Sequence, residues 1–73
     1  MNKKELMAEI AFRAGSTTTD VLAHLEAFEE IVAETLSEGE EVQVSSFGRF
    51  CIREREGRRV PVFHAGKKLR EAI

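Results

Sequence analysis

Four arginines that lie close together are the residues of this sequence whose type and spacing best fit a chemical task. They flank Glu56-Gly57, within a stretch that also contains apolar and acidic residues. A basic surface of this kind is the footprint expected of phosphate binding, although a solvated charged face is the commoner explanation of any single run of charge. The four candidates are Arg53, Arg55, Arg58 and Arg59.

The charge of the chain is divided unevenly along its length. Residues 1 to 41 contain three basic and ten acidic side chains, whereas residues 42 to 73 contain eight basic and three acidic ones. The net charge of −2 therefore hides two parts of opposite sign. If a polyanion is bound, we expect the second part to bind it.

No set of residues in the sequence predicts a catalytic or metal site. Ser45-Ser46 has no histidine at a recognisable spacing, and no glycine-rich phosphate loop precedes a helix. His24 and His64 are far apart in sequence, and we interpret both as surface residues. Cys51 is the only cysteine, which excludes a disulfide within the chain, and we interpret it as an inert thiol. We therefore predict that the protein is not an enzyme and has no metal or cofactor.

The length of 73 residues, of which 42% are hydrophobic, is enough for one small domain spanning residues 1–73. Such a domain has a marginal core and is usually stabilised by disulfides, a metal or a partner subunit. The first two are not predicted here, so oligomerisation is the remaining expectation. The sequence contains no long apolar run, and we expect a cytoplasmic protein with no membrane partner.

Helical periodicity dominates the first half of the chain. Apolar residues at one-face spacing predict a helix over residues 3–14 that ends at Gly15. Thr17 and Asp20 have the spacing of a capping box, so a second helix should begin near residue 18 and continue to Gly39.

The period changes to two after Gly39, which predicts β-strands. Val42 and Val44 belong to a first strand, and residues 49–56 form a second strand after a tight connection at Ser46-Phe47-Gly48. If Glu56-Gly57 is a two-residue loop, a third strand follows in a defined register. The pairs expected in that register are Arg55 with Arg58, Glu54 with Arg59, and Phe50 with Phe63.

Two features complete the expected secondary structure. Pro61 lacks an amide donor, so it should lie where the third strand faces outward or ends. A short basic helix should follow Ala65-Gly66 over residues 67–73.

Several motifs together resemble the bacterial HU-type DNA-binding proteins, the family that includes integration host factor. The motifs occur in the family's order and span almost the whole chain. They are MNKKELMAEIA, GEEVQVSSFGRF, REREGRRV and VPVFHAGKKLREAI.

The resemblance implies an α+β fold: two N-terminal helices, a three-stranded antiparallel sheet, a short C-terminal helix and an intertwined homodimer. It also implies a nucleoid-associated protein that binds double-stranded DNA largely without sequence preference. The aromatic positions of the dimer core would be Phe28, Phe47, Phe50 and Phe63. The DNA-binding positions would be Lys3, Arg53, Arg55, Arg58, Arg59, Lys67, Lys68 and Arg70.

One part of the family's pattern is missing from this sequence. The family carries two long β-ribbon arms with a proline near each tip that wedges between base steps and kinks the duplex. Here a short hairpin around Glu56-Gly57 replaces the arm, and Pro61 matches a later proline in the sheet. We therefore expect weak bending by a basic saddle that contacts phosphates. The alternative is a protein-interaction module with little DNA affinity, which pairs with a full-length HU-type subunit in a heterodimer or with another protein.

Overall fold

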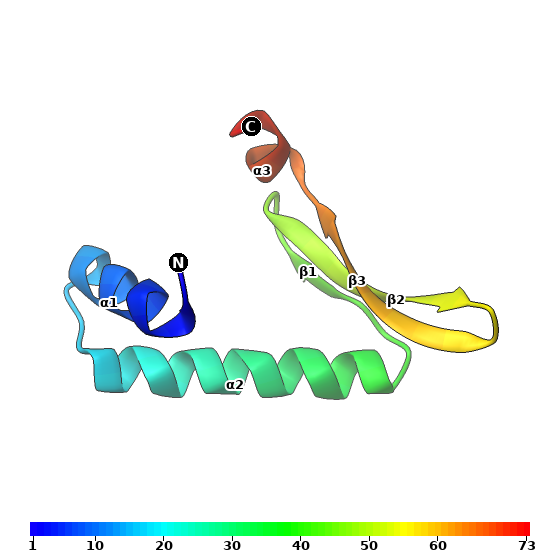
Figure 1. The fold of residues 1–73 in the computed structure, drawn as a ribbon, viewed down its shortest axis with the longest axis horizontal. Coiled ribbons are helices and arrows are strands. Elements are labelled where there is room, and N and C mark those ends of the chain that lie inside the picture. The colour runs from blue at the N-terminus through cyan, green and yellow to red at the C-terminus, as the bar shows by residue number, and fades with distance from the viewer. The chain divides into compact units, whose positions relative to one another are not determined.

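The computed structural model describes all 73 residues and has an α+β fold. The chain consists of two compact units, Met1–Glu30 and Ile31–Ile73, and the boundary between them falls within the second helix. None of the helices is long and apolar enough to cross a membrane. The elements, labelled in Figure 1, are α1 (Lys3–Ala14), α2 (Thr18–Ser37), β1 (Val42–Val44), β2 (Gly48–Arg55), β3 (Arg58–Ala65) and α3 (Lys67–Glu71).

Helix α1 occupies the predicted residues and is capped at both ends. The Asn2 side chain accepts a hydrogen bond from the Glu5 backbone N–H, and the Glu5 carboxylate accepts one from the Asn2 N–H. This capping box was not predicted, although Asn-x-x-Glu has the required spacing. Gly15 adopts the left-handed conformation, with φ of 64°, that ends many helices.

Helix α2 begins and ends close to the predicted positions. The Thr17 hydroxyl accepts a hydrogen bond from the Asp20 N–H at 3.1 Å, which is one half of the predicted capping box. At the other end the Gly39 N–H donates to the Leu36 carbonyl and the Glu40 N–H donates to the Thr35 carbonyl. This pair of bonds is a Schellman motif, and it satisfies carbonyls that the helix leaves without partners.

The sheet has the predicted three antiparallel strands in the order β1-β2-β3. The loop prediction is confirmed, because Glu56 and Gly57 both have positive φ, 51° and 77°, as a type I′ turn requires. The predicted register is confirmed as well, since Phe50 pairs with Phe63 and Arg55 pairs with Arg58. Pro61 lies in β3, an edge strand of the sheet, where a missing amide donor is tolerated.

Gly48 was expected to form part of the tight connection between the first two strands, but its role in the structure is different. It is the first residue of β2, and a side chain there would collide with the Phe63 ring and the His64 carbonyl oxygen. The positive φ in the connection between β1 and β2 belongs instead to Ser45, at 39°. The small size of Gly48 therefore allows the Phe63 ring to lie against the β2 backbone.

Helix α3 is shorter than the predicted 67–73 segment and ends at Glu71. Its start is fixed to the β1–β2 connection, because the Gly66 N–H donates to the Phe47 carbonyl at 2.7 Å and the Lys68 N–H donates to the Ser46 carbonyl at 3.0 Å. These bonds hold the basic helix at the end of the sheet opposite the β2–β3 loop.

The interior of each unit is small. Ala11 and Val21 are the buried apolar residues of the first unit, and Leu36 and Cys51 are those of the second. No large side chain is fully buried, and several large apolar residues are exposed, among them Phe28 (41%), Ile31 (57%) and Phe47 (43%). One copy of the chain therefore leaves uncovered much of the apolar surface that would normally form a core.

Candidate nucleic-acid interface

Three arginines share one face of the β2–β3 ribbon, and we refer to them as the hairpin arginines: Arg53, Arg55 and Arg58. Arg55 and Arg58 are direct cross-strand partners, and Arg53 lies two residues before Arg55 on the same face. All three are exposed, and no carboxylate lies within 4.0 Å of any of their side-chain nitrogens. They therefore form no ion pair within the chain.

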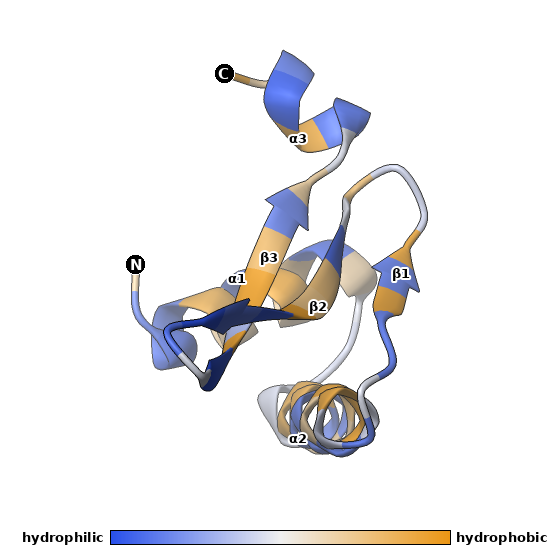
Figure 2. Ribbon diagram, turned by 90° about the vertical axis from the view of Figure 1, so that its right-hand side faces the viewer, coloured by the Kyte–Doolittle hydropathy of each residue, from blue (hydrophilic) through white to orange (hydrophobic).

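Like charges directly opposite each other destabilise an antiparallel pair. Arg55 and Arg58 therefore lower the stability of the hairpin tip. The middle of the ribbon is apolar, as the hydropathy colours of Figure 2 show. An anion placed over Arg55 and Arg58 would relieve the repulsion and receive charge-assisted hydrogen bonds. The hairpin tip therefore has the chemistry of a phosphate-binding surface.

The same face becomes apolar toward the centre of the sheet. Cys51 pairs with Val62, and Arg53 pairs with Val60, so apolar side chains lie between the arginines. Cys51 is buried, at 9% exposure, whereas strand alternation had placed it among exposed arginines. Burial agrees with the prediction of an inert thiol, because reactive cysteines are accessible.

Arg59 lies apart from the hairpin arginines. Its cross-strand partner is Glu54, which places both residues on the opposite face of the ribbon. Its Nη2 donates hydrogen bonds to the carbonyl oxygens of Leu36 at 3.1 Å and Ser37 at 3.4 Å, at the end of α2. Because its guanidinium is engaged within the chain, we do not include Arg59 in the proposed interface.

A second basic group belongs to α3, and we refer to it as the α3 cations: Lys67, Lys68 and Arg70. Lys67 Nζ lies 4.0 Å from the Glu71 carboxylate, and neither Lys68 nor Arg70 has an ion pair. The length of β3 separates this group from Arg58 by roughly 23 Å, at the usual rise of a strand. The second unit thus carries basic groups at both ends of its ribbon.

Lys3 belongs to the first unit and is already paired. Its Nζ lies 3.0 Å from Oε2 and 3.1 Å from Oε1 of Glu29, so the ion pair connects α1 to the part of α2 that belongs to the first unit. Both side chains are about half exposed. A DNA phosphate would have to compete with Glu29 for this lysine.

The aromatic residues predicted for the dimer core cluster at the sheet. The Phe63 ring lies 4.9 Å from the Phe50 ring and 5.6 Å from the Phe47 ring, centroid to centroid. Phe47 and Phe63 remain 43% and 38% exposed. The cluster is formed in the single chain, but this chain does not cover it.

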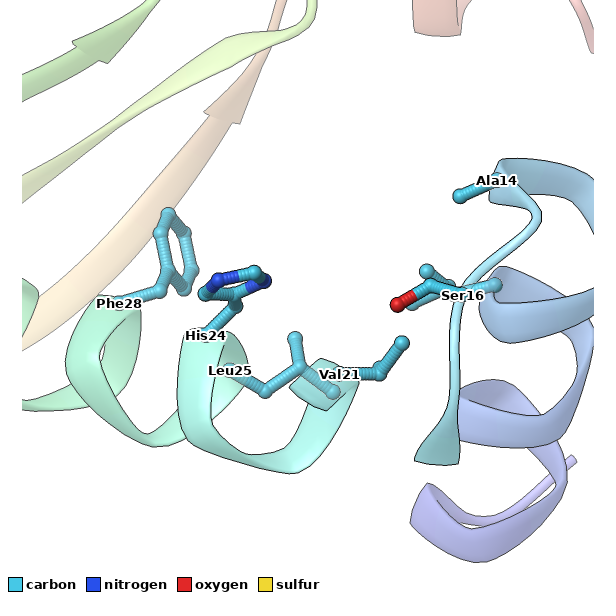
Figure 3. A pocket seen from close by; sticks show the side chains of 7 residues that line it. Ala14, Ser16, Val21, His24, Leu25 and Phe28 are labelled. Carbon is cyan, nitrogen blue, oxygen red and sulfur yellow. The ribbon is translucent and has the colours of Figure 1, made fainter. Parts of the chain in front are cut away.

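The first unit contains an apolar pocket of about 480 Å³ between α1 and the part of α2 that belongs to this unit (Figure 3). Phe28 and Leu25 line it from α2, together with the exposed ring of His24. The pocket brings no catalytic group together, and no cluster of metal-ligating side chains exists in the chain. The lining of the pocket is suited to apolar side chains.

Comparison with known proteins identifies the family. A model of the family described as "Bacterial DNA-binding protein" matches residues 1–61. HU of Lactococcus lactis is 41% identical over 88 aligned positions, which cover 99% of this chain and 97% of the relative. The chain belongs to the bacterial HU-type DNA-binding protein family. HU of Thermotoga maritima is a further relative, 36% identical over 100% of this chain and 99% of its own length.

Solved HU structures have the same fold. A mutant HU of Thermotoga maritima matches with a TM-score of 0.90 and 42% identity, over 99% of this chain and 97% of that one. An HU–DNA cocrystal structure from Anabaena matches with a TM-score of 0.90 and 38% identity, over 99% and 96%. The predicted α+β fold is therefore confirmed, and the predicted homodimer is consistent with an HU-type protein. Family membership also confirms that the protein is not an enzyme.

Proposed function

We propose that this protein binds double-stranded DNA, largely without sequence preference, through phosphate contacts made by the hairpin arginines and the α3 cations. The observation that carries the proposal is the pair formed by Arg55 and Arg58, two cations placed opposite each other with no acidic partner. Backbone contacts of this kind position a duplex without reading its sequence. The HU–DNA cocrystal structure of Anabaena, a structural relative, supports the proposal. We place the protein in the bacterial nucleoid.

The binding form is proposed to be an intertwined homodimer. The exposed phenylalanines at positions 28, 47 and 63 and the apolar pocket of the first unit support this form, because a second copy supplies apolar surface of the same kind. We propose that residues 1–73 act as one HU-like domain in that dimer, since HU relatives align with the whole chain.

Bending of the DNA is proposed to be weak. The ribbon closes at Glu56-Gly57 after two strands of eight residues, and no proline lies at its tip. The alignment with Lactococcus HU extends over 88 positions, whereas this chain has 73 residues, so the relative contains residues with no counterpart here. Without a wedge to hold base steps apart, the cost of a kink has nothing to offset it.

A protein-interaction role is the alternative, favoured by the acidic character of residues 1 to 41. In that case the chain would pair with a full-length HU-type subunit or another protein and contribute little DNA affinity. The exposed phenylalanines suit either role, but the unpaired hairpin arginines favour DNA.

The direct test is a titration of the purified protein into two short labelled duplexes of unrelated sequence at low salt, followed by fluorescence anisotropy. We expect binding to both duplexes with similar affinity. Absence of binding to either duplex would favour the protein-interaction role, and a large difference between the duplexes would contradict recognition through phosphates alone.

A further inference from the structure

Arg59 connects two elements that are separated along the chain. Its Nη2 donates to the carbonyl oxygens of Leu36 and Ser37, which lie 23 and 22 residues earlier in the sequence. Its neighbour Arg58 belongs to the opposite face of the ribbon and has no acidic partner. Two adjacent arginines therefore have different surroundings and are suited to different tasks.

The end of α2 is a site where a cation is favourable. The last turn of the helix contains no basic residue of its own. Glu34 and Glu38 lie at this end, where the helix dipole already concentrates negative charge. The guanidinium of Arg59 supplies the missing positive charge and binds two of the terminal carbonyls. Arg59 thus caps the helix from a distant strand.

The hydrogen bonds of Arg59 also hold the part of the sheet that has only two strands. β1 pairs only with Gly48, Arg49 and Phe50, so residues beyond Phe50 form a two-stranded ribbon. A two-stranded hairpin alone is marginally stable in water. The two bonds of Arg59 are the only side-chain hydrogen bonds that residues 51 to 65 make with the rest of the chain.

We propose that Arg59 is a positioning residue that anchors the outer ribbon to the C-terminal end of α2. The anchor holds one face of the ribbon against the helix end, and strand alternation then presents the hairpin arginines on the other face. The link to DNA affinity rests on the proposed function, whereas the anchoring itself does not. The short ribbon is therefore a fixed part of the sheet, pre-organised for its ligand.

The test compares Arg59→Met with Arg58→Met, the same chemical change at adjacent positions on opposite faces. Amide hydrogen exchange of the free protein reports on the ribbon without any DNA present. We expect residues 53 to 58 to exchange about tenfold faster in Arg59→Met, roughly the effect of losing a charge-assisted hydrogen bond. Arg58→Met should leave exchange at the level of the unmodified protein or slow it, because it removes a repulsion.

Duplex binding at several salt concentrations gives the second measurement. Arg59→Met should weaken binding by a similar factor at every salt concentration, whereas Arg58→Met should flatten the salt dependence. A flattened dependence in Arg59→Met would identify Arg59 as a phosphate contact and overturn the proposal. Unchanged hydrogen exchange in Arg59→Met would overturn it too. If no form of the protein binds DNA, the proposed function fails while the exchange measurement still decides the anchor.

Two additional variants address a failure of Arg59→Met to fold and separate the effect of charge at the helix end from anchoring of the ribbon. If Arg59→Met does not fold, Arg59→Lys keeps the charge without the planar fork, and we expect partial loss of protection with an unchanged salt dependence. Ser37→Lys combined with Arg59→Met returns a cation to the last turn of α2. In this double variant, we expect the α2 amides to be protected from hydrogen exchange and the ribbon amides to remain unprotected. Restored protection of the ribbon would show that only the helix charge matters, which contradicts an anchor.

Discussion

Arg55 and Arg58 lie directly opposite each other across the β2–β3 ladder, on either side of a two-residue turn, and no carboxylate lies within 4.0 Å of their side-chain nitrogens. Among the ion-paired cations, Lys3, Arg13, Arg49 and Lys67, none lies at this tip. The proposed function assigns these unpaired cations to the phosphates of DNA.

Replacing a hairpin arginine should weaken DNA binding without unfolding the protein. We expect Arg53→Gln to lower the affinity by a similar factor for different sequences, because phosphate contacts carry no sequence information. The matched control is Arg13→Gln, which removes an exposed arginine that is paired with Glu9 in α1. Anisotropy titrations with two unrelated duplexes measure both. Equal losses in the two variants would mean that overall charge, and not the hairpin, determines affinity.

The dimer should be obligate for folding. Only four apolar residues are buried in one chain, so we expect a second copy to cover the proposed dimer core for the fold to be stable. The unfolding midpoint in urea should therefore rise with protein concentration. A folded monomer detected by sedimentation at micromolar concentration would be incompatible with this prediction.

Phe50→Ala should be strongly destabilising. The Phe50 ring packs on Phe63 at a centroid distance of 4.9 Å in the proposed dimer core. Loss of such a ring costs about 3–5 kcal/mol when it is buried, which is a large part of the stability of a small domain. Denaturant unfolding measures the effect. Phe12→Ala is the control, because Phe12 is 84% exposed and does not belong to the proposed dimer core, so its loss should change stability by less than about 0.5 kcal/mol.

Gly48→Ala should destabilise the sheet through overpacking. An added methyl group would meet the Phe63 ring and the His64 carbonyl oxygen, so the aromatic cluster would have to move. Overpacking of this kind costs about 1–3 kcal/mol. Gly15→Ala is a useful comparison, since its cost arises from positive φ alone, with nothing near the new methyl group. A neutral Gly48→Ala variant would show that the Phe63 ring has room to shift.

The ribbon register could be predicted from the sequence because local features determine it. Alternation fixes which residues share a face, and Glu56-Gly57 tolerates the positive φ values of a tight turn, so every cross-strand pair follows. The helix boundaries were predictable for the same reason, since Gly15 and Gly39 end the periodic segments. The capping box of Asn2 and Glu5 follows from a local pattern as well, because Asn-x-x-Glu has the spacing that it requires.

The environments of Arg59 and Cys51 could not be predicted in this way. Strand alternation groups Cys51 with exposed arginines, but its burial depends on what packs around the centre of the sheet. The sequence does not distinguish Arg59 from the neighbouring arginines, because its capping role depends on the position of the end of α2 in the fold. Both are consequences of tertiary packing, which a local pattern does not contain.

The duplex should remain nearly straight when the protein binds. Kinking requires base steps to be unstacked, at a few kcal/mol per step, and the short ribbon has no wedge to stabilise the unstacked state. Energy transfer between dyes at the two ends of a short duplex would report bending. We expect little change at saturating protein. A sharp approach of the two ends would show that the body of the protein bends DNA without arms.

The salt dependence of duplex affinity tests the central claim most directly. The measurement compares the unmodified protein with a variant in which all three hairpin arginines are replaced by glutamine. The logarithm of the association constant should fall linearly with the logarithm of salt concentration for the unmodified protein, and the slope should lessen by about 0.9 for each phosphate contact removed. Both hairpins of a dimer lose their contacts together, which enlarges the change. Equal slopes for the two proteins would contradict the claim that the hairpin arginines bind phosphate.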